Sequence, residues 1–370
     1  LLWLWTRNRD QLIFFPWFDR SRGARIARSV PPPEVLHDWA LELLRAGDHY
    51  RVGYRAAFSY PGDVPLRTLR SPAIITATRT DVLGAYLERI TEPAPGVVAR
   101  VGGSMDENLT EAAEFFAANP GTQPPAAPQP EPLANAAWNA TVKTTMGYVR
   151  VRANLSQPGM PLLLVHGLGE ACEPLEPLLT ALAAERPVLA LDLPGHGESA
   201  ELLSAGDSAA APGFLAACRA ALEAVLDHLA LQQVDAVASG GGAVVLADAA
   251  LAHPARYRRL ALLGLPYLEP AAARAEAARF APRIEPRWHG GHLLEYWHVV
   301  RNQRLFWPWY EQTEAHALLG EPGVDAAGLH VRVLALMKSA AHLPTAAAAV
   351  FGYPLDGALA DLSQPVLQAA

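Results

Sequence analysis

Two stretches of this chain that lie 292 residues apart resemble each other closely. Residues 1–19 read LLWLWTRNRDQLIFFPWFD, and residues 293–311 read LLEYWHVVRNQRLFWPWYE. The match resumes at an offset of 293, where His49, Ala56, Phe58, Tyr60, Pro61, Asp63, Leu69 and Pro72 meet His342, Ala349, Phe351, Tyr353, Pro354, Asp356, Leu362 and Pro365. Because Trp, Pro and Phe coincide at a nearly constant spacing, the sequence predicts a tandem repeat of about 292 residues. The 370-residue chain then contains every part of one unit, in permuted order.

A proline-rich segment divides the chain. Residues 120–137 form an Ala- and Gln-rich run that contains Pro120, Pro124, Pro125, Pro128, Pro130 and Pro132. This composition is typical of a semi-rigid, solvated spacer. We therefore place the main domain boundary in this linker.

The composition restricts the class of protein. Hydrophobic residues make up 51% of the chain and charged residues 18%, which excludes a disordered chain or a disulfide scaffold. The net charge is −7 without a Lys/Arg-rich run, so we expect no nucleic-acid partner. No uncharged run of 18 apolar residues occurs, so we expect no membrane partner, and the absence of targeting signals indicates the cytoplasm. Cys172 and Cys218 are too few for a thiolate cluster, and we expect neither a metal nor a cofactor.

After the linker, short apolar runs alternate with amphipathic helical patterns. The pattern predicts a hairpin over 142–153, strands over 161–165, 188–191, 234–238 and 260–263, and helices over 173–185 and 213–231. Such alternation indicates an α/β fold with a mostly parallel sheet. Glycine turns follow several of these strands, at the edge of the sheet where ligands bind in such folds.

Three segments together resemble the α/β-hydrolase superfamily. They are LLLVHGLG at 162–169, LALDLPGHGES at 189–199 and VDAVASGGGAVVLADAALAHPARYRRLALLG at 234–264. The resemblance implies that 138–268 form the N-terminal core of a hydrolase-like unit, 269–355 its helical cap and 356–370 the start of the next core strand. It likewise implies that 1–119 contain part of a cap and the C-terminal half of such a unit. Its fold class is α/β, with a hydrolase-type sheet flanked by helices.

The family's nucleophile elbow, G-x-S-x-G, can be aligned to this chain in two registers. Counting back from His253 and Pro254 puts Gly240 at the nucleophile position, with Ala238 and Gly242 as the small flanking residues. Aligning serine on serine instead puts Ser239 at the tip. We favour the first register, in which no side chain is available to attack a substrate.

The resemblance also assigns the other parts of the site. Leu168 and Gly241 would supply the backbone N–H groups of an oxyanion hole, and Asp81 would be the acid of a triad or a turn residue. His166, Gly167, Gly169 and Gly242 would shape the site. The family's general base is absent, because no histidine lies between His49 and His166 and its expected place is held by Ser104 or Met105.

Three functions remain open at this stage. The chain is a cofactor-free hydrolase of an ester or similar acyl compound in an apolar pocket, a degenerate hydrolase fold that binds a small molecule or acts as a scaffold, or an inactive fragment. An open half-sheet would expose a long unpaired edge. We therefore expect the strands of 72–101 to complete the sheet begun at 142–264.

Overall fold

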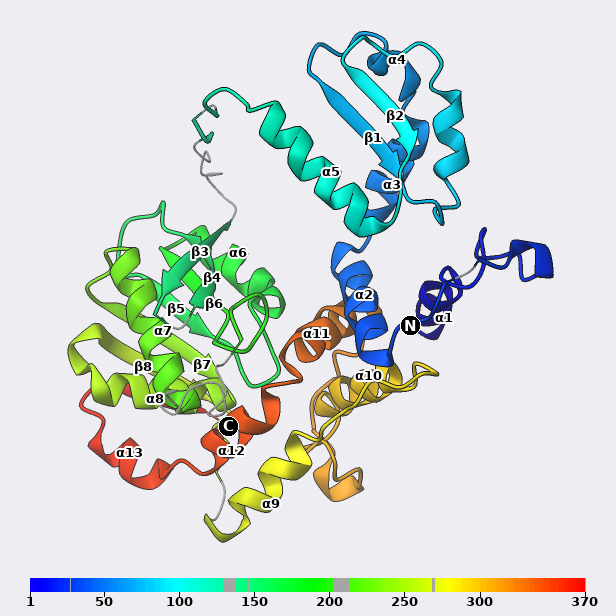
Figure 1. The fold of residues 1–370 in the computed structure, drawn as a ribbon. Helices are drawn as coiled ribbons and strands as arrows, with labels where there is room; N and C mark the ends of the chain where they lie inside the picture. The colour runs from blue at the N-terminus through cyan, green and yellow to red at the C-terminus, as the bar shows by residue number, and fades with distance from the viewer. Residues whose placement is uncertain are drawn as a thin grey trace. The chain divides into compact units, whose positions relative to one another are not determined.

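A computed structural model describes residues 1–26, 28–124, 126–128, 137–145, 147–201, 213–267 and 270–369. The chain divides into two compact units, residues 1–130 and residues 131–370 (Figure 1). Their boundary lies within the range 120–137 that the sequence analysis assigned to a linker.

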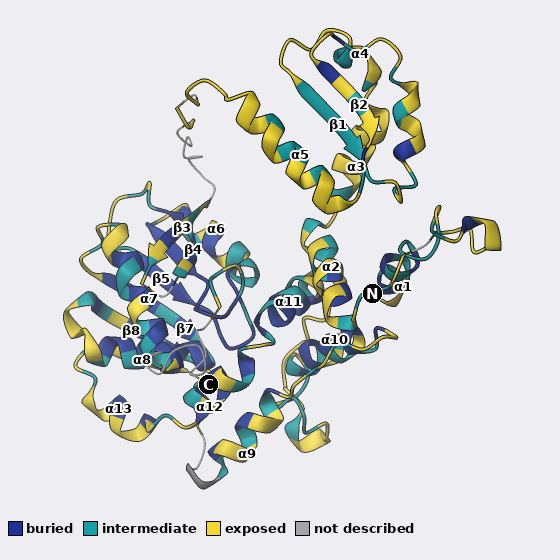
Figure 2. Cartoon of the chain, viewed as in Figure 1, coloured by how far each residue is buried: buried dark blue, intermediate teal, exposed yellow. Residues whose placement is uncertain are grey.

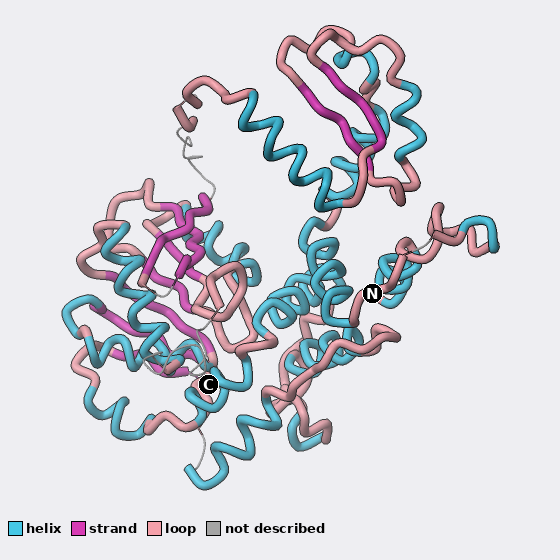
Figure 3. The backbone as a smooth tube through the Cα atoms, in the orientation of Figure 1, coloured by secondary structure: helices cyan, strands magenta, loops and turns pink. Residues whose placement is uncertain are grey.

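The second unit contains a seven-stranded sheet in the order β3-β4-β6-β5-β7-β8-β9 (Figure 3). β3 and β4 form an antiparallel hairpin, β4 pairs antiparallel with β6, and every other pair is parallel. The mostly parallel α/β sheet predicted from the sequence is therefore confirmed. The strands are Trp138–Thr144, Gly147–Asn154, Leu162–Val165, Val188–Leu191, Val234–Ser239, Tyr257–Leu263 and Val366–Ala369, numbered β3 to β9.

The core of this unit lies around its central strands. β5 (LLLV) and β6 (VLAL) are buried at every position, as expected for parallel strands covered on both faces (Figure 2). Helix α8, Gly241–Ala252, contacts β5, β7 and β8, while α7, Phe214–His228, contacts α8, β3 and β4. α6, Glu176–Ala183, contacts β6. α8 is apolar on nearly all sides and buried over most of its length, which fits its central place.

Helices dominate the segment between β8 and β9. α10 packs on α11, and α12 packs on α9 as well as on α7 and α8 of the core. α13 contacts α8 and leads into β9. Their bounds are Pro270–Phe280, His292–Gln303, Ala326–Ser339, Leu343–Phe351 and Leu355–Asp361 for α9 to α13.

The expected pairing between the strand near residue 73 and the strand near residue 260 is wrong. β8 pairs instead with β9, with Leu260 opposite Val366 and Leu263 opposite Ala369. Residues 356–370 were expected to begin a core strand, and they occupy the sheet position that we had assigned to residues 72–77. α13 packs on α8 and is joined to β9 by four residues, so it holds β9 at this edge of the sheet.

In the first unit, β1 and β2 form a separate two-stranded parallel sheet, with Ala73 opposite Val97. α5 begins at Met105, where Ser104 and Glu107 form a capping box with reciprocal side chain–backbone hydrogen bonds. The elements of this unit are α1 Leu2–Asp10, α2 Pro33–Ala46, α3 His49–Ser59, α4 Asp63–Leu66, β1 Ala73–Ala77, β2 Val97–Val101 and α5 Met105–Ala118.

Candidate functional site

The turn between β7 and α8 brings a glycine to the carboxyl edge of the sheet. β7 ends at Ser239, and α8 begins at Gly241. Between them, Gly240 has φ +52° and ψ −127°, a conformation that favours glycine. Its N–H donates to the Leu263 carbonyl oxygen at 2.8 Å, which ties the turn to the neighbouring strand. A Cβ atom at residue 240 would meet no other atom within 4 Å, so the tip of this turn faces open space.

The next two glycines are required for a different reason. A Cβ atom at Gly242 would lie 2.1 Å from the His166 carbonyl oxygen, and one at Gly241 would lie 2.5 Å from Leu168 Cγ. The first turn of α8 therefore packs against the loop that follows β5, at a distance that leaves no room for side chains. This contact brings the backbone N–H of Gly241, which has no intrahelical acceptor at the first position of a helix, close to Leu168.

His166 is fully buried in that loop, and backbone groups occupy both of its ring nitrogens. The Leu193 N–H donates to Nε2 at 3.0 Å, so Nε2 acts as an acceptor. Nδ1 lies 2.8 Å from the Gly167 carbonyl oxygen and therefore carries the proton of a neutral ring. This arrangement links the loops after β5 and β6 and leaves neither nitrogen free to accept a proton from a substrate.

Glu170 connects the same loop to the helices that follow β8. Its Oε2 accepts from the Gly167 N–H at 3.1 Å, and its Oε1 accepts from Arg332 Nη1 of α11 at 2.5 Å. Gly169 has φ +72°, and a Cβ atom there would lie 2.9 Å from Leu336 Cδ1 of α11. The loop after β5 thus contacts both α8 and α11 at short range.

A pocket of about 590 Å³ opens over the Gly240 turn, entirely within the second unit. Loops at the carboxyl edge of the sheet line one side of it, and residues of the segment between β8 and β9 line the other. The described lining residues are Gly167–Glu170, Ser239–Gly241, Leu263–Pro266, Phe280, Val300, Gln303, Arg304, Trp307, Leu318, Arg332 and Phe351. No histidine is among them. The structure therefore brings together Ser239, Gly240, Gly241, Leu168, Gly167 and Gly169 in one site, but no imidazole base.

Asp81 belongs to the first unit. Its Oδ1 accepts from the Leu83 N–H at 2.9 Å and its own N–H donates to the Thr78 carbonyl oxygen, so its side chain closes a turn after β1. Ser104, in the range where the family's base would be expected, is the N-cap of α5.

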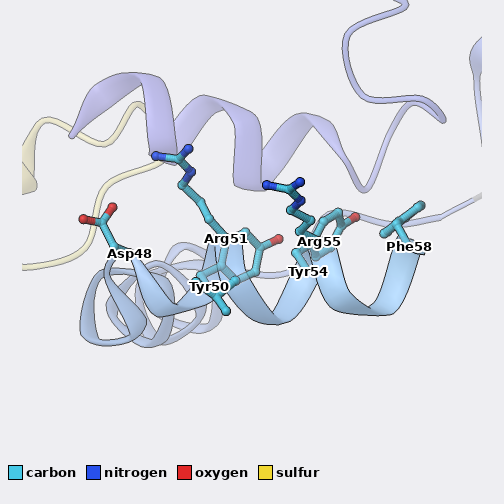
Figure 4. A pocket seen from close by; sticks show the side chains of 7 residues that line it. Asp48, Tyr50, Arg51, Tyr54, Arg55 and Phe58 are labelled. Atoms are coloured by element: carbon cyan, nitrogen blue, oxygen red, sulfur yellow. The ribbon is translucent and has the colours of Figure 1, made fainter. Parts of the chain in front are cut away.

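A second hollow, of about 580 Å³, lies along α3 of the first unit (Figure 4). Its seven lining residues come from α3 and from Asp48 directly before it, including Tyr50, Tyr54 and Phe58. No other element of the described chain closes this hollow, whereas the pocket over Gly240 is enclosed by three loops and several helices. We therefore take the latter as the candidate site.

Sequence reasoning missed an ion cluster beside the pocket. Lys338 Nζ of α11 lies 3.1 Å from Glu173 Oε1 and 2.6 Å from Glu198 Oε1, and Arg150 Nη1 lies 2.7 Å from Glu173 Oε1. Burial alone would raise the pKa of Glu173, but the positive charges of Lys338 and Arg150 lower it to about 2. No local pattern signals this cluster, because its members are separated by up to 188 residues or so along the chain.

Two residues of the DLPGHG loop hold the core together. The buried Asp192 accepts from the Cys172 N–H at 2.7 Å and from the Glu198 N–H at 2.8 Å. Burial, together with the nearby His166 and His342, lowers the pKa of His196 to about 3, so its ring is neutral at ordinary pH. Both residues therefore serve the structure of the loop.

Within the described ranges, no group of three or more His, Cys, Asp or Glu residues is arranged to hold a metal ion. Among the same residues, no single helix is long and apolar enough to cross a membrane. α11 and α12 reach that length and composition only as a pair, and they are bent by 90° at the break between them.

The fold and the glycine turn define a class of protein. Residues 160–293 match the family described as alpha/beta hydrolase fold. A curated relative from Pseudomonas putida, the dihydrolipoyllysine-residue acetyltransferase component of an acetoin cleaving system, is 45% identical over 106 residues. That match covers 28% of this chain and 26% of the relative, so the chain spans about a quarter of that protein's length.

Solved structures of hydrolases are similar at low identity. A hydrolase from Pseudomonas aeruginosa PA01 is 22% identical, with a TM-score of 0.47, and the match covers 62% of this chain and 78% of that one. Epoxide hydrolase A from Mycobacterium thermoresistibile is 18% identical, with a TM-score of 0.48, over 63% of this chain and 82% of that one.

Proposed function

We propose that the second unit is a degenerate α/β hydrolase that binds a small, mainly apolar molecule and forms no covalent intermediate on its elbow. One observation carries this proposal: the residue with the strained backbone at the tip of the strand–turn–helix is Gly240, which has no side chain. In the hydrolase pattern, the nucleophile stands at the tip of such a strained turn.

The neighbouring glycines support this register. The last position of the G-x-S-x-G pattern must hold a small residue, because the elbow packs closely there. Gly242 meets this requirement, since it lies against the His166 backbone with no room for a Cβ atom. The pattern then runs Ala238-Ser239-Gly240-Gly241-Gly242. In the competing register, Gly241 would be that last glycine; a Cβ atom there would lie 2.5 Å from Leu168 Cγ, a side-chain atom, whereas at Gly242 it would meet backbone, which cannot move aside.

The binding features of the fold are retained in this proposal. The N–H groups of Leu168 and Gly241 would form the oxyanion hole, and the helices between β8 and β9 would form the cap. The pocket between them is of a size usual for small-molecule sites. A carbonyl oxygen of the ligand would accept hydrogen bonds from the two amides, while Phe280, Trp307 and Phe351 would contact its apolar part.

We also propose that the chain carries parts of two successive hydrolase-like units. The isolated bridge between Phe14 and Arg25 has a counterpart between Phe306 and Ala317, 292 residues later. Helix α2 and helix α11 each contain 14 residues and begin 293 residues apart. These correspondences support the tandem repeat predicted from the sequence.

Exposure to a fluorophosphonate probe, followed by intact mass and peptide mapping, tests the absence of a nucleophile. We expect no adduct on the folded protein. In parallel, calorimetry should detect saturable binding of 4-phenylbutanamide, weakened about fivefold by Trp307→Ala because an aromatic contact is lost.

Hydrolysis through Ser239 is the second candidate function, because Ser239 ends β7 and lines the pocket. An adduct that maps to Ser239 and disappears in Ser239→Ala would establish it and overturn the proposal above.

A further inference from the structure

We propose that the ligand of this pocket is a carboxylate with an apolar body, and that Arg304 supplies its counter-charge. This inference rests on the proposed binding function and specifies the chemical class of the ligand. It starts from the charged residues of the pocket. The described lining contains two arginines, Arg304 and Arg332, but a single acid, Glu170.

The negative charge of Glu170 is already compensated by neighbouring donors. One of its oxygens accepts from Arg332, and the other accepts from the Gly167 N–H. Arg304, at the C-cap of α10, forms no ion pair with any residue that the structure describes. The pocket therefore has one positive charge without a partner at its rim.

The loop side of the pocket favours an anion as well. α8 has 12 residues, and its N-cap, Gly240, offers no side chain to its N–H groups. The Ala243 N–H donates to the Gly240 carbonyl oxygen at 3.0 Å, so Gly241, which lines the pocket, is the residue whose N–H group can meet a ligand at the positive end of this helix dipole. An arginine fork together with backbone N–H groups matches the two oxygens of a carboxylate.

The sequence match between the two parts of the chain indicates that these arginines are not needed for packing. At the offsets of 292 and 293, Arg304 is matched by Leu12 and Arg332 by Trp39. The matched helices α2 and α11 nevertheless have the same length, and Leu36 and Leu329 are buried at matched positions. α11 can therefore form without Arg332. α1, which matches α10, has 9 residues where α10 has 12, but the matched bridges Phe14–Arg25 and Phe306–Ala317 form with either Leu12 or Arg304 before them, so that segment does not require the Arg304 charge.

The rest of the wall determines the body of the ligand. Phe280, Val300, Trp307, Leu318 and Phe351 are apolar and face the pocket from the cap side. A flexible acid with an aromatic or aliphatic chain satisfies both halves of the site, with its acid group at Arg304 and the amides and its chain against these side chains.

The test compares two ligands of nearly equal shape, 4-phenylbutyrate and 4-phenylbutanamide, by calorimetry on the full chain. We expect the carboxylate to bind at least about tenfold more tightly, because its charge-assisted hydrogen bonds replace neutral ones. Arg304→Leu, which installs the residue found at the matched position, should reduce this preference to about twofold or less while leaving amide binding in place. The control is Arg283→Leu, which removes an exposed arginine between α9 and α10 that does not line the pocket. This variant should keep the preference.

The outcomes separate the two proposals. Equal binding of both probes to the unaltered protein would overturn the carboxylate inference and leave the binding function intact. A preference that survives Arg304→Leu would overturn the role of Arg304. If neither probe binds, both the binding function and this inference are wrong.

Discussion

Gly242 lies directly against the backbone of His166, so that a Cβ atom at residue 242 would come within 2.1 Å of the His166 carbonyl oxygen. This contact joins the first turn of α8 to the loop after β5, which both line the pocket. His166 in turn accepts from the Leu193 N–H, which joins the loop after β6 to the same point. Three loops at the carboxyl edge of the sheet are thus held together by the backbone and the side chain of His166.

Gly242→Ala should destabilise the second unit by about 2 kcal/mol or more, because the methyl group would force α8 away from the loop. Chemical denaturation monitored by far-UV circular dichroism measures this change. The matched control is Gly357→Ala in α13, where a Cβ atom meets nothing within 4 Å. There alanine should raise stability by roughly 0.5–1 kcal/mol, since glycine is a poor helix former. Equal effects at the two positions would contradict the close packing at Gly242.

Gly240→Ser should fold, at a cost of roughly 1–2 kcal/mol, because the backbone at residue 240 is strained for any residue with a Cβ atom although the space is open. The new hydroxyl should remain a poor nucleophile, since no described residue lining the pocket is a histidine. Ester hydrolysis assays on the variant and the unaltered protein check this directly. A large gain in esterase activity would reveal a base outside the described lining of the pocket.

Glu173 should make the protein sensitive to acid. Its pKa in the folded state, about 2, lies below the ordinary value of 4.5, so the unfolded chain takes up this proton first. The ionised Glu173 carboxylate therefore contributes its full stabilisation above pH 4.5, and this contribution is lost as the pH falls towards 2. After allowance for solvent screening of a one-third exposed side chain, it amounts to about 2 kcal/mol at most.

Glu173→Gln tests this by denaturation at a series of pH values. The variant should be less stable at pH 7, and its stability should fall less steeply between pH 4.5 and pH 2. Glu321→Gln, at an exposed position outside the cluster, should leave the whole profile unchanged. Parallel pH profiles for Glu173→Gln and the unaltered protein would show that Lys338 and Arg150 do not hold the carboxylate as described.

His196 should remain neutral in the folded protein well below the ordinary pKa of histidine. Burial is the main cause, and it lowers the pKa to about 3. As the pH falls, His196 therefore binds its proton first in the unfolded chain. The free energy of unfolding is not reduced by this group above pH 6.5, and it declines as the pH falls from 6.5 towards 3. NMR titration of the imidazole signals, assigned with His196→Asn, should show no protonation of His196 between pH 8 and about pH 4.5. A midpoint near 6.5 in the folded protein would be inconsistent with its burial.

Local signals explain how much could be predicted. The runs LLLV and VLAL were recognised as buried strands because they are short, continuous and apolar, and the structure has β5 and β6 at those residues. α5 starts at Met105, directly after the Ser104 N-cap of the Ser104–Glu107 capping box, which is also a local signal. The ion cluster around Lys338 could not be predicted, because no local sequence pattern indicates that charged residues far apart in the chain lie close together in the fold.

By itself, the sequence determined the order of strands and helices in the second unit and the glycine turns at their carboxyl ends, because apolar periodicity and glycine act over a few residues. Only the tertiary structure decided which strand lies beside β8. β1 and β9 occupy matched positions in the two similar stretches, so their local patterns could not distinguish them. α13 packs on α8 and ends four residues before β9, so this docked helix, rather than any property of the strand itself, places β9 at that edge.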